Sequence, residues 1–328
     1  MSRKLRFMMI GMGDVAQRLA LSEPARRARW FGLTRSDEAR TRARASSVLS
    51  VSGDLDSRIS LLRAANIARS SAATIFLAPP PNIGGDDPRV KRWIAARSRA
   101  LTRPLRGERR FEALRRASRA HSGRRGKSTL TDIYVSTTGV YGDRAGERVS
   151  EVSVLRAQSA RAARRVAAER RVRNSAQTRM AVLRVPGIYA QTRLPIERLR
   201  ERLPALVAAE DVYTNHIHAD DLAHAIWLSV FRARAGRTYN IVDDAEWKMG
   251  DYFDRVADAL GFVRPPRMSR GELARHITPM MLSFMSESRR IENTRMKREL
   301  RLVMRYPTPD TLLQSMNPTD ALQRSLDV

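Results

Sequence analysis

The most constraining feature of the sequence is a glycine pattern near its start. The apolar run Leu5 to Ile10 leads into Gly11-Met12-Gly13-Asp14-Val15-Ala16 and then into a helix-like segment. In a strand–turn–helix unit of this kind, Gly11 permits the tight turn, Gly13 lets a phosphate approach the backbone, and Ala16 lets helix and strand pack closely. The helix N-terminus favours an anion. A lone match also fits a simple tight turn, but its place at the head of an α/β series predicts a dinucleotide site that includes Gly11, Met12, Gly13, Asp14 and Val15.

Apolar runs alternate with helix-like segments along the first half of the chain. Strands are expected at 29–35, 47–51, 74–78, 132–136 and 180–185, and helices at 87–101 and 154–172. This alternation predicts an α/β fold with a doubly wound parallel sheet of the Rossmann type.

Beyond Tyr189 the strict alternation fades. Helices are expected at 194–208, 220–232, 251–260, 270–276 and 287–300, and extended pieces at 212–218 and 238–242. We therefore expect a dinucleotide-binding domain over 1–186, completed by about 216–243, and a smaller substrate-capping region over 187–215 and 244–328.

Composition excludes several classes of protein. The chain has no cysteine, so it holds no disulfide and no thiolate nucleophile, and it has no apolar run of about 18 residues that would predict a transmembrane helix. We expect a cytoplasmic protein with no membrane partner. The net charge is +27, and only five of the 61 basic residues are lysine. A polyanion such as nucleic acid is one explanation, with 89–127 as its best location. Arginines scattered over solvated faces are the favoured one, because they span the chain with few aromatic residues among them.

The end of the second expected strand bears on the choice of cofactor. About 20 residues past the glycine pattern, an acidic residue would bind the ribose of NAD, whereas arginine suits the 2′-phosphate of NADP. Arg35 stands there, with Asp37 close by. NADP or NAD is expected, with NADP slightly favoured, although Arg35 also fits a plain surface residue. Asp54 follows the next strand and either faces the adenine or caps a helix that starts near Asp56.

Taken in order, several motifs resemble the extended short-chain dehydrogenase/reductase superfamily, the NAD-dependent epimerase/dehydratase family, over residues 5 to about 310. The motifs are Gly11 to Ala16, Gly53-Asp54-Leu55, Leu77-Ala78-Pro79, Ser136 to Gly142, Leu183 to Tyr189, Asn215 to Ala223 and Tyr239 to Asp243. The resemblance implies a Rossmann domain followed by a part that closes over the substrate, usually a nucleotide sugar. It also implies a homodimer through two helices, one of them 154–172.

The resemblance also implies a catalytic pattern that this chain keeps only in part. The family uses a Ser or Thr four residues before a Tyr, which falls on Thr137 before Tyr141, and then a Tyr-x-x-x-Lys about 20 residues later. Arg161 and Arg165 stand in the positions of that tyrosine and lysine. Arginine does not give up a proton near neutral pH, so the usual relay is absent, as in the atypical branch of the superfamily. Tyr141, Tyr189 and His218 are possible substitute acids, although each fits a structural role better, His218 beside a helix that Asp220 would cap.

The candidate site residues form three groups. Thr137 and Tyr141 are the catalytic candidates. Besides the glycine pattern and Arg35, the cofactor-binding candidates are Asp54, Leu55, Ala78, Pro79, Pro80, Pro186 and Ile188. The substrate-binding candidates are Thr138, Tyr189, Asn215 and His216. No metal is expected, because His216-x-His218 lacks a third spaced ligand.

Two functions remain open. The first is an NAD(P)-dependent epimerase, dehydratase or oxidoreductase acting on a small carbonyl or sugar substrate. The second is a non-catalytic dinucleotide-binding sensor or partner-binding module.

Overall fold

A computed structural model describes residues 4–82, 84–102, 131–175 and 180–316. Most of the basic run 89–127, from residue 103 onward, lies outside these residues. The chain divides into two compact units, the first formed by Met1–Tyr134, Ala167–Ala181 and Ser229–Arg237, and the second by Val135–Val166, Val182–Leu228 and Thr238–Val328. The border falls inside the sheet, and the domain bounds expected from the sequence stay a prediction.

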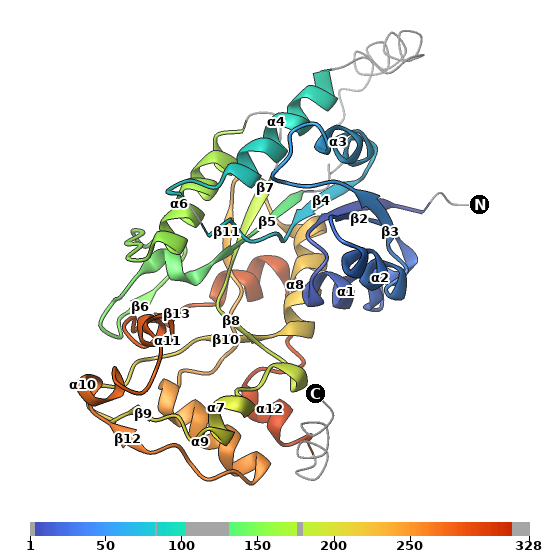
Figure 1. Cartoon of the computed structure of the whole chain (residues 1–328). Coiled ribbons are helices and arrows are strands. Elements are labelled where there is room, and N and C mark those ends of the chain that lie inside the picture. Colours follow the sequence, from blue (N-terminus) through green and yellow to red (C-terminus); the bar gives the residue numbers. More distant parts are fainter. Residues whose placement is uncertain (1–3, 83, 103–130, 176–179, 317–328) are drawn as a thin grey trace, which may run out of the picture. The chain divides into compact units, whose positions relative to one another are not determined.

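Seven parallel strands form the central sheet, in the order β11-β7-β5-β4-β1-β2-β3 (Figure 1). The strands are β1 (Arg6–Ile10), β2 (Arg29–Thr34), β3 (Leu49–Ser52), β4 (Ala73–Phe76), β5 (Asp132–Thr137), β7 (Met180–Val185) and β11 (Thr238–Asn240). On β1, Met8 pairs with Phe31 of β2 on one side and with Thr74 of β4 on the other. The strand order therefore reverses beside β1, and the Rossmann-type fold is confirmed.

Helices cover both faces of the strands in the first unit. These helices are α1 (Asp14–Leu21), α2 (Asp37–Ala45), α3 (Leu61–Arg69) and α4 (Pro88–Thr102), with the 3-10 turn η1 (Ala25–Arg27). Figure 1 shows α1 and α2 on one face, and α3 packed beside α4 on the other. The core is dense: Phe7 of β1 is fully buried and its ring lies 4.9 Å from that of Trp30. The helix expected from Asp56 begins only at Leu61, because residues 54–60 form turns.

The second unit combines short paired strands with short helices. Its strand pairs are β8 (Gly187–Tyr189) with β10 (His216–His218), β9 (Ala205–Leu206) with β12 (Arg267–Met268), and β6 (Arg148–Val149) with β13 (Arg290–Ile291). Its helical segments are η2 (Thr138–Tyr141), η3 (Gln191–Arg193), α7 (Ile196–Arg200), α9 (Met249–Leu260), α10 (Arg270–Leu273), α11 (Pro279–Phe284), η4 (Met296–Leu300) and α12 (Pro309–Leu313). Two longer helices, α6 (Ala160–Arg173) and α8 (Ala219–Arg232), contribute residues to both units.

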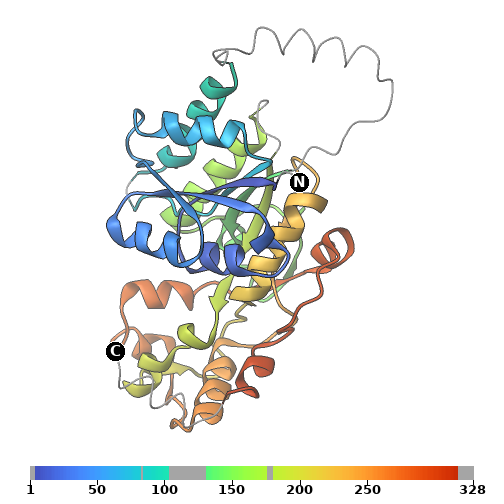
Figure 2. The same cartoon turned by 90° about the vertical axis from the view of Figure 1, so that its right-hand side faces the viewer.

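One apolar cluster unites the C-terminal elements of the second unit. Residues of α7, β9, α9, α10 and α12 contribute to this cluster. These elements lie close together in the lower part of the view in Figure 2. Its centre includes Leu199, Leu206, Val256, Leu260 and Leu273.

Three further helix predictions need correction. The segment 194–208 holds only the short α7, because Ala205–Leu206 pairs with β12 instead. The segment 287–300 begins as β13, which pairs with β6, and ends as the π-helical turn η4. The helix expected from 154 begins at Ala160, where the Oγ of Ser159 accepts a hydrogen bond from the Ala162 N–H.

None of the helices within the described residues has the length and apolar character needed to cross a membrane.

Candidate functional site

The glycine turn after β1 is shaped by a close neighbour. Gly11 has a φ of +107°, a conformation that side-chain-bearing residues rarely adopt, and a Cβ there would lie 2.9 Å from the backbone nitrogen of Ala78. That nitrogen donates to the carbonyl of Ile10 at 2.9 Å. The segment after β4 thus rests directly on the turn, and only glycine fits at position 11.

Gly13 leaves open space at the N-terminus of α1. It is the N-cap residue with ordinary extended dihedrals (φ −87°, ψ −175°), and no atom lies within 4 Å of the place a Cβ would occupy. Gly13 itself has no side chain that could cap the helix, and the first N–H groups of any helix lack an acceptor within it. Met12 is buried and Asp14 pairs with Arg18 at 2.9 Å. An open turn that carries backbone donors suits the oxygens of a phosphate.

The residues after β2 present one arginine to solvent. Arg35 is exposed, whereas the hydroxyl of the next residue, Ser36, accepts a hydrogen bond from the Ala39 N–H and so caps α2. Asp37 pairs with Arg40 within the same helix, at 2.9 Å. Arg35 can therefore meet a ligand phosphate, whereas the carboxylate of Asp37, the group that would bind a ribose hydroxyl, already pairs with Arg40.

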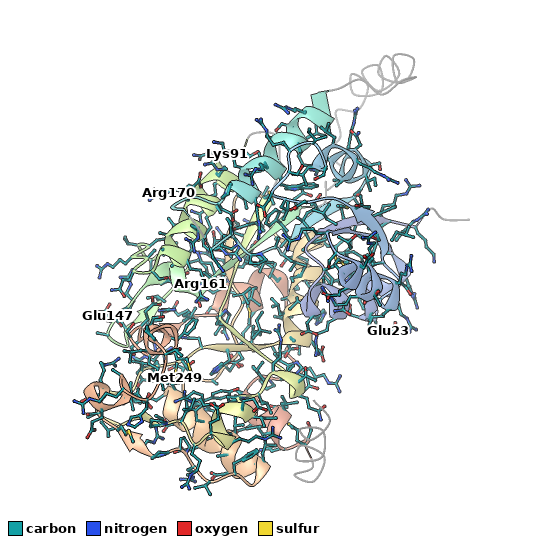
Figure 3. The ribbon with its side chains drawn as sticks, in the orientation of Figure 1. Glu23, Lys91, Glu147, Arg161, Arg170 and Met249 are labelled. Carbon is teal, nitrogen blue, oxygen red and sulfur yellow. The ribbon has the colours of Figure 1, made fainter. Side chains whose placement is uncertain are left out.

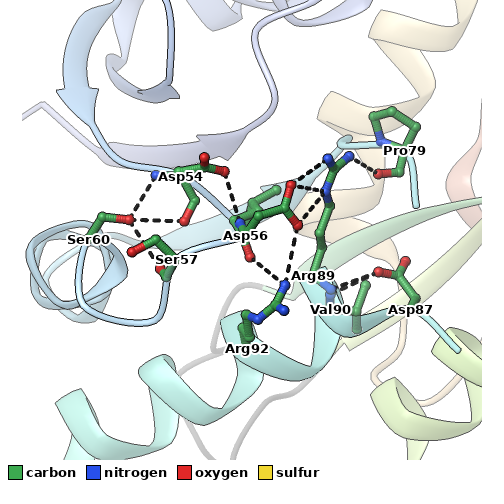
Figure 4. Close-up of polar contacts among 10 residues, drawn as sticks. Asp54, Asp56, Ser57, Ser60, Pro79, Asp87, Arg89, Val90 and Arg92 are labelled. Atoms are coloured by element: carbon green, nitrogen blue, oxygen red, sulfur yellow. Dashed lines mark hydrogen bonds and ion pairs between the residues drawn. The ribbon is translucent and has the colours of Figure 1, made fainter. Parts of the chain in front are cut away.

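Polar contacts link the segments that follow β3 and β4 (Figure 4). A carboxylate oxygen of Asp54 accepts the N–H of Asp56 at 2.9 Å, which fixes the turn that also carries the buried Leu55. Asp56 pairs with Arg89, and Arg89 also donates to the carbonyl of Pro79 at 3.1 Å. The expected cofactor residues on these two segments are thus connected, and Pro80 beside them is buried.

The ion pairs of Asp56 with Arg89 and Arg92 were not predicted from the sequence. The hydrogen bond from Arg89 lowers the pKa of the Asp56 carboxyl most, and the charges of Arg89, Arg92 and Arg35 add to the effect. Arg89 and Arg92 each lie more than 30 residues from Asp56 in the sequence. Arginine is so frequent in this chain that no local pattern distinguishes these two.

In the second unit, Thr137 is the last residue of β5, and its hydroxyl group can still donate a hydrogen bond. Its oxygen accepts the N–H of Gly139 at 3.2 Å, which leaves the hydroxyl proton to be donated. A substrate carbonyl is a suitable acceptor. The next residue, Thr138, is buried at the start of η2.

Tyr141 has its hydroxyl held on two sides. The hydroxyl donates to the Oδ1 of Asn240 at 2.7 Å and accepts a hydrogen bond from the guanidinium of Arg184 at 2.8 Å. Burial raises the pKa of this hydroxyl. The arrangement favours a structural brace between η2, β7 and β11 over a proton-transfer role.

Replacing Tyr141 by phenylalanine tests that role. Tyr141→Phe leaves the buried Asn240 oxygen and Arg184 nitrogen without this partner, so the free energy of unfolding should fall by about 1–3 kcal/mol. Urea denaturation measures the loss. An unchanged stability together with lost activity would contradict the structural role.

Helix α6 carries the two arginines in the expected dyad positions. Figure 3 shows Arg161 on this helix, and its guanidinium lies over the ring of Phe284 at 4.7 Å. Arg165 donates to the carbonyl of Val135 in β5 at 3.1 Å. The Ala162 Cβ lies only 3.9 Å from where a Gly139 Cβ would be, which places the start of α6 beside the turn after Thr137. Neither arginine supplies an acid near neutral pH.

The other substrate candidates lie in or beside a buried aromatic cluster. The ring of His216 stacks on Tyr252 with centroids 4.3 Å apart, and that of His218 stacks on Tyr306 at 3.7 Å. The ring of Tyr189 meets both histidines edge-on. Burial lowers the pKa of His216 to about 4, so its imidazole is neutral at pH 7.

His218 rather than Asp220 caps helix α8. The Nδ1 atom of His218 accepts the N–H of Asp220 at 3.2 Å, so the capping role expected for the aspartate belongs to the histidine. The side chain of Asn215 bridges the backbone of β13: it donates to the Arg289 carbonyl and accepts the N–H of Ile291. Pro186 and Ile188 lie at the β7–β8 junction and are half-buried.

In the described part of the chain, no group of three or more His, Cys, Asp or Glu residues is placed to hold a metal ion.

Comparison with solved structures identifies the fold. A conserved protein of unknown function from Silicibacter pomeroyi matches with a TM-score of 0.71 and 24% identity, over 95% of this chain and 98% of its own. An NAD-dependent epimerase/dehydratase from Methylobacillus flagellatus matches at 0.66 and 20% identity, over 98% and 100%. The chain shares its fold with these two proteins. The protein MoeE5, solved with UDP-glucose and NAD, also matches this fold at 0.68 and 16% identity, over 98% and 99%. The sequence matches no family model and no curated protein.

Proposed function

We propose that this chain binds a nicotinamide dinucleotide and acts on a small carbonyl or sugar substrate. The observation that carries the proposal is the glycine turn, where Gly13 leaves the N-terminus of α1 open while Gly11 is fitted to Ala78. A phosphate-bearing ligand suits that geometry. The solved MoeE5 structures, which hold NAD with a UDP-sugar, supply the class of cofactor and substrate.

The residues of this chain suggest how the dinucleotide would be held. The backbone from Gly11 to Val15 would receive the pyrophosphate. The segments at Asp54 and Pro79 would flank the adenosine, and Arg35 would favour the 2′-phosphate of NADP. The nicotinamide, when bound, supplies hydride transfer to or from a substrate carbon.

Thr137 is the proposed contact to the reacting carbonyl. Its free hydroxyl proton would hydrogen-bond the carbonyl oxygen and orient it. The proton that accompanies the hydride needs another carrier, because Arg161 and Arg165 cannot provide it.

A non-catalytic role is the second candidate function. The same two arginines favour it, since one covers a phenylalanine ring and the other holds a backbone carbonyl. The chain would then bind the dinucleotide as a sensor or a partner-binding module.

Turnover separates the two functions. The protein is incubated with NAD or NADP and a panel of nucleotide sugars and small carbonyl compounds, and products are followed by nicotinamide absorbance and chromatography. An enzyme should show turnover that falls at least about 10-fold in Thr137→Val, with dinucleotide affinity unchanged. Dinucleotide binding without turnover would favour the sensor, and no binding would overturn both.

A further inference from the structure

A compact ion cluster joins three segments of the first unit (Figure 4). The carboxylate of Asp56 accepts hydrogen bonds from Arg89 Nε at 3.1 and 3.2 Å and from Arg89 Nη2 at 2.7 Å. Arg92 Nη1 approaches the same carboxylate at 3.2 Å and the Leu55 carbonyl at 3.3 Å. Arg89 Nη1 reaches the Pro79 carbonyl at 3.1 Å. One carboxylate therefore ties the turn after β3 to helix α4, and through Arg89 to the segment after β4.

The sheet topology places the linked segments on either side of the glycine turn and Arg35. β3 and β4 are not neighbours, because β1 and β2 lie between them in the strand order. The glycine turn follows β1 and Arg35 follows β2, so the linked segments flank both of them at the carboxyl ends of the strands. Ligands of open α/β sheets bind at that edge, where the strand order reverses.

The ion pair of the cluster is accessible to solvent. The Asp56 side chain is 39% exposed and that of Arg89 19%, so solvent and salt reach the ion pair. A bidentate arginine–carboxylate pair is geometrically specific, yet its exposure keeps the net stabilisation small. It can therefore hold two segments in register without locking them.

We propose that Asp56, with Arg89 and Arg92, forms a clasp that holds the adenosine end of the dinucleotide site closed and slows release of the dinucleotide. Asp56 is a positioning residue in this scheme, since it acts through the segments that it joins. The inference rests on the proposed dinucleotide binding and adds to it the control of exchange.

The test measures the dissociation rate of bound NADH by stopped-flow displacement with excess ADP-ribose. Asp56→Asn should release NADH at least about 5-fold faster, because a neutral amide holds both arginines more weakly. Raising the salt concentration should speed release from the wild type more than from Asp56→Asn, because only the wild type has this ion pair to screen. Arg89→Gln should behave alike, and the double variant should be little worse than either single one.

Asp258→Asn is the matched control. Asp258 pairs with Arg264 in the same bidentate way, at 2.8 and 2.7 Å, but in the second unit. It should leave the dissociation rate and its salt dependence unchanged. Equal rates for Asp56→Asn, Arg89→Gln and the control would overturn the clasp alone. Absence of NADH binding to the wild type would overturn the proposed function, and the clasp with it. Thermal unfolding of each variant identifies misfolded protein, and Arg89→Gln keeps the test valid if Asp56→Asn fails to fold.

Discussion

Gly13→Asp should remove dinucleotide binding without harming the fold. The backbone at Gly13 is extended and its Cβ direction is empty, so an aspartate fits, and aspartate is a preferred N-cap residue. Its carboxylate would occupy the place proposed for the pyrophosphate, and like charges in contact cost several kcal/mol. Affinity for NADH should fall at least about 100-fold, a loss of about 2.7 kcal/mol, while the unfolding temperature stays level or rises.

A matched variant distinguishes a local effect at the glycine turn from the general effect of an added negative charge. Thr278 is the N-cap residue of α11 in the second unit, so Thr278→Asp makes the same kind of change away from the glycine turn. It should bind NADH like the wild type. Equal affinities for Gly13→Asp and Thr278→Asp would show that the turn does not hold a phosphate.

The contribution of His216 to the free energy of unfolding should fall in mild acid. Burial lowers the pKa of His216 to about 4, whereas an unfolded histidine titrates near 6.5. Between these values the unfolded chain binds a proton that the folded chain does not, so stability is lost as the pH falls from about 6.5 towards 4. The pKa difference corresponds to a loss of about 2 kcal/mol at pH 5 and about 3 kcal/mol at the lower end.

The histidine contribution is isolated by difference, because buried carboxyls nearby act in the opposite direction. Burial raises the pKa values of Asp221 and Asp243, so protonation favours the folded state as the pH falls. Urea unfolding at pH 7 and pH 5 is compared for the wild type, His216→Gln and the exposed control His276→Gln. His216→Gln should lose about 2 kcal/mol less on acidification than either of the others. The same loss in all three would exclude His216 as the source.

The elements that could be predicted from the sequence are those with strong local patterns. The strands β1, β4 and β7 are mostly apolar, and the glycine turn carries its own fingerprint. The failures at 194–208 and 287–300 have one physical cause. Strand pairs formed with distant residues, β9 with β12 and β13 with β6, override helix-like local composition.

The residues of the candidate site likewise form two groups, those marked by a sequence motif and those defined by contacts with distant residues. Gly11 was named from the local glycine pattern and Thr137 from the motif of the family that the sequence resembles, and both roles stay predictions. The contacts of Tyr141 with Arg184 and Asn240 span 43 and 99 residues, and the partners of Asp56 lie 33 and 36 residues away. Sequence spacing gives no signal for such pairs, which exist only once the sheet has brought the strand ends together.

The most direct test of dinucleotide binding is a titration of the purified wild-type protein with NADH and, separately, NADPH. The protein is first freed of carried-over nucleotide, and nicotinamide fluorescence is followed. We expect saturable binding at one site per chain, with NADPH binding more tightly than NADH because Arg35 would receive its 2′-phosphate. Binding of neither nucleotide to the folded protein would contradict the proposed dinucleotide binding.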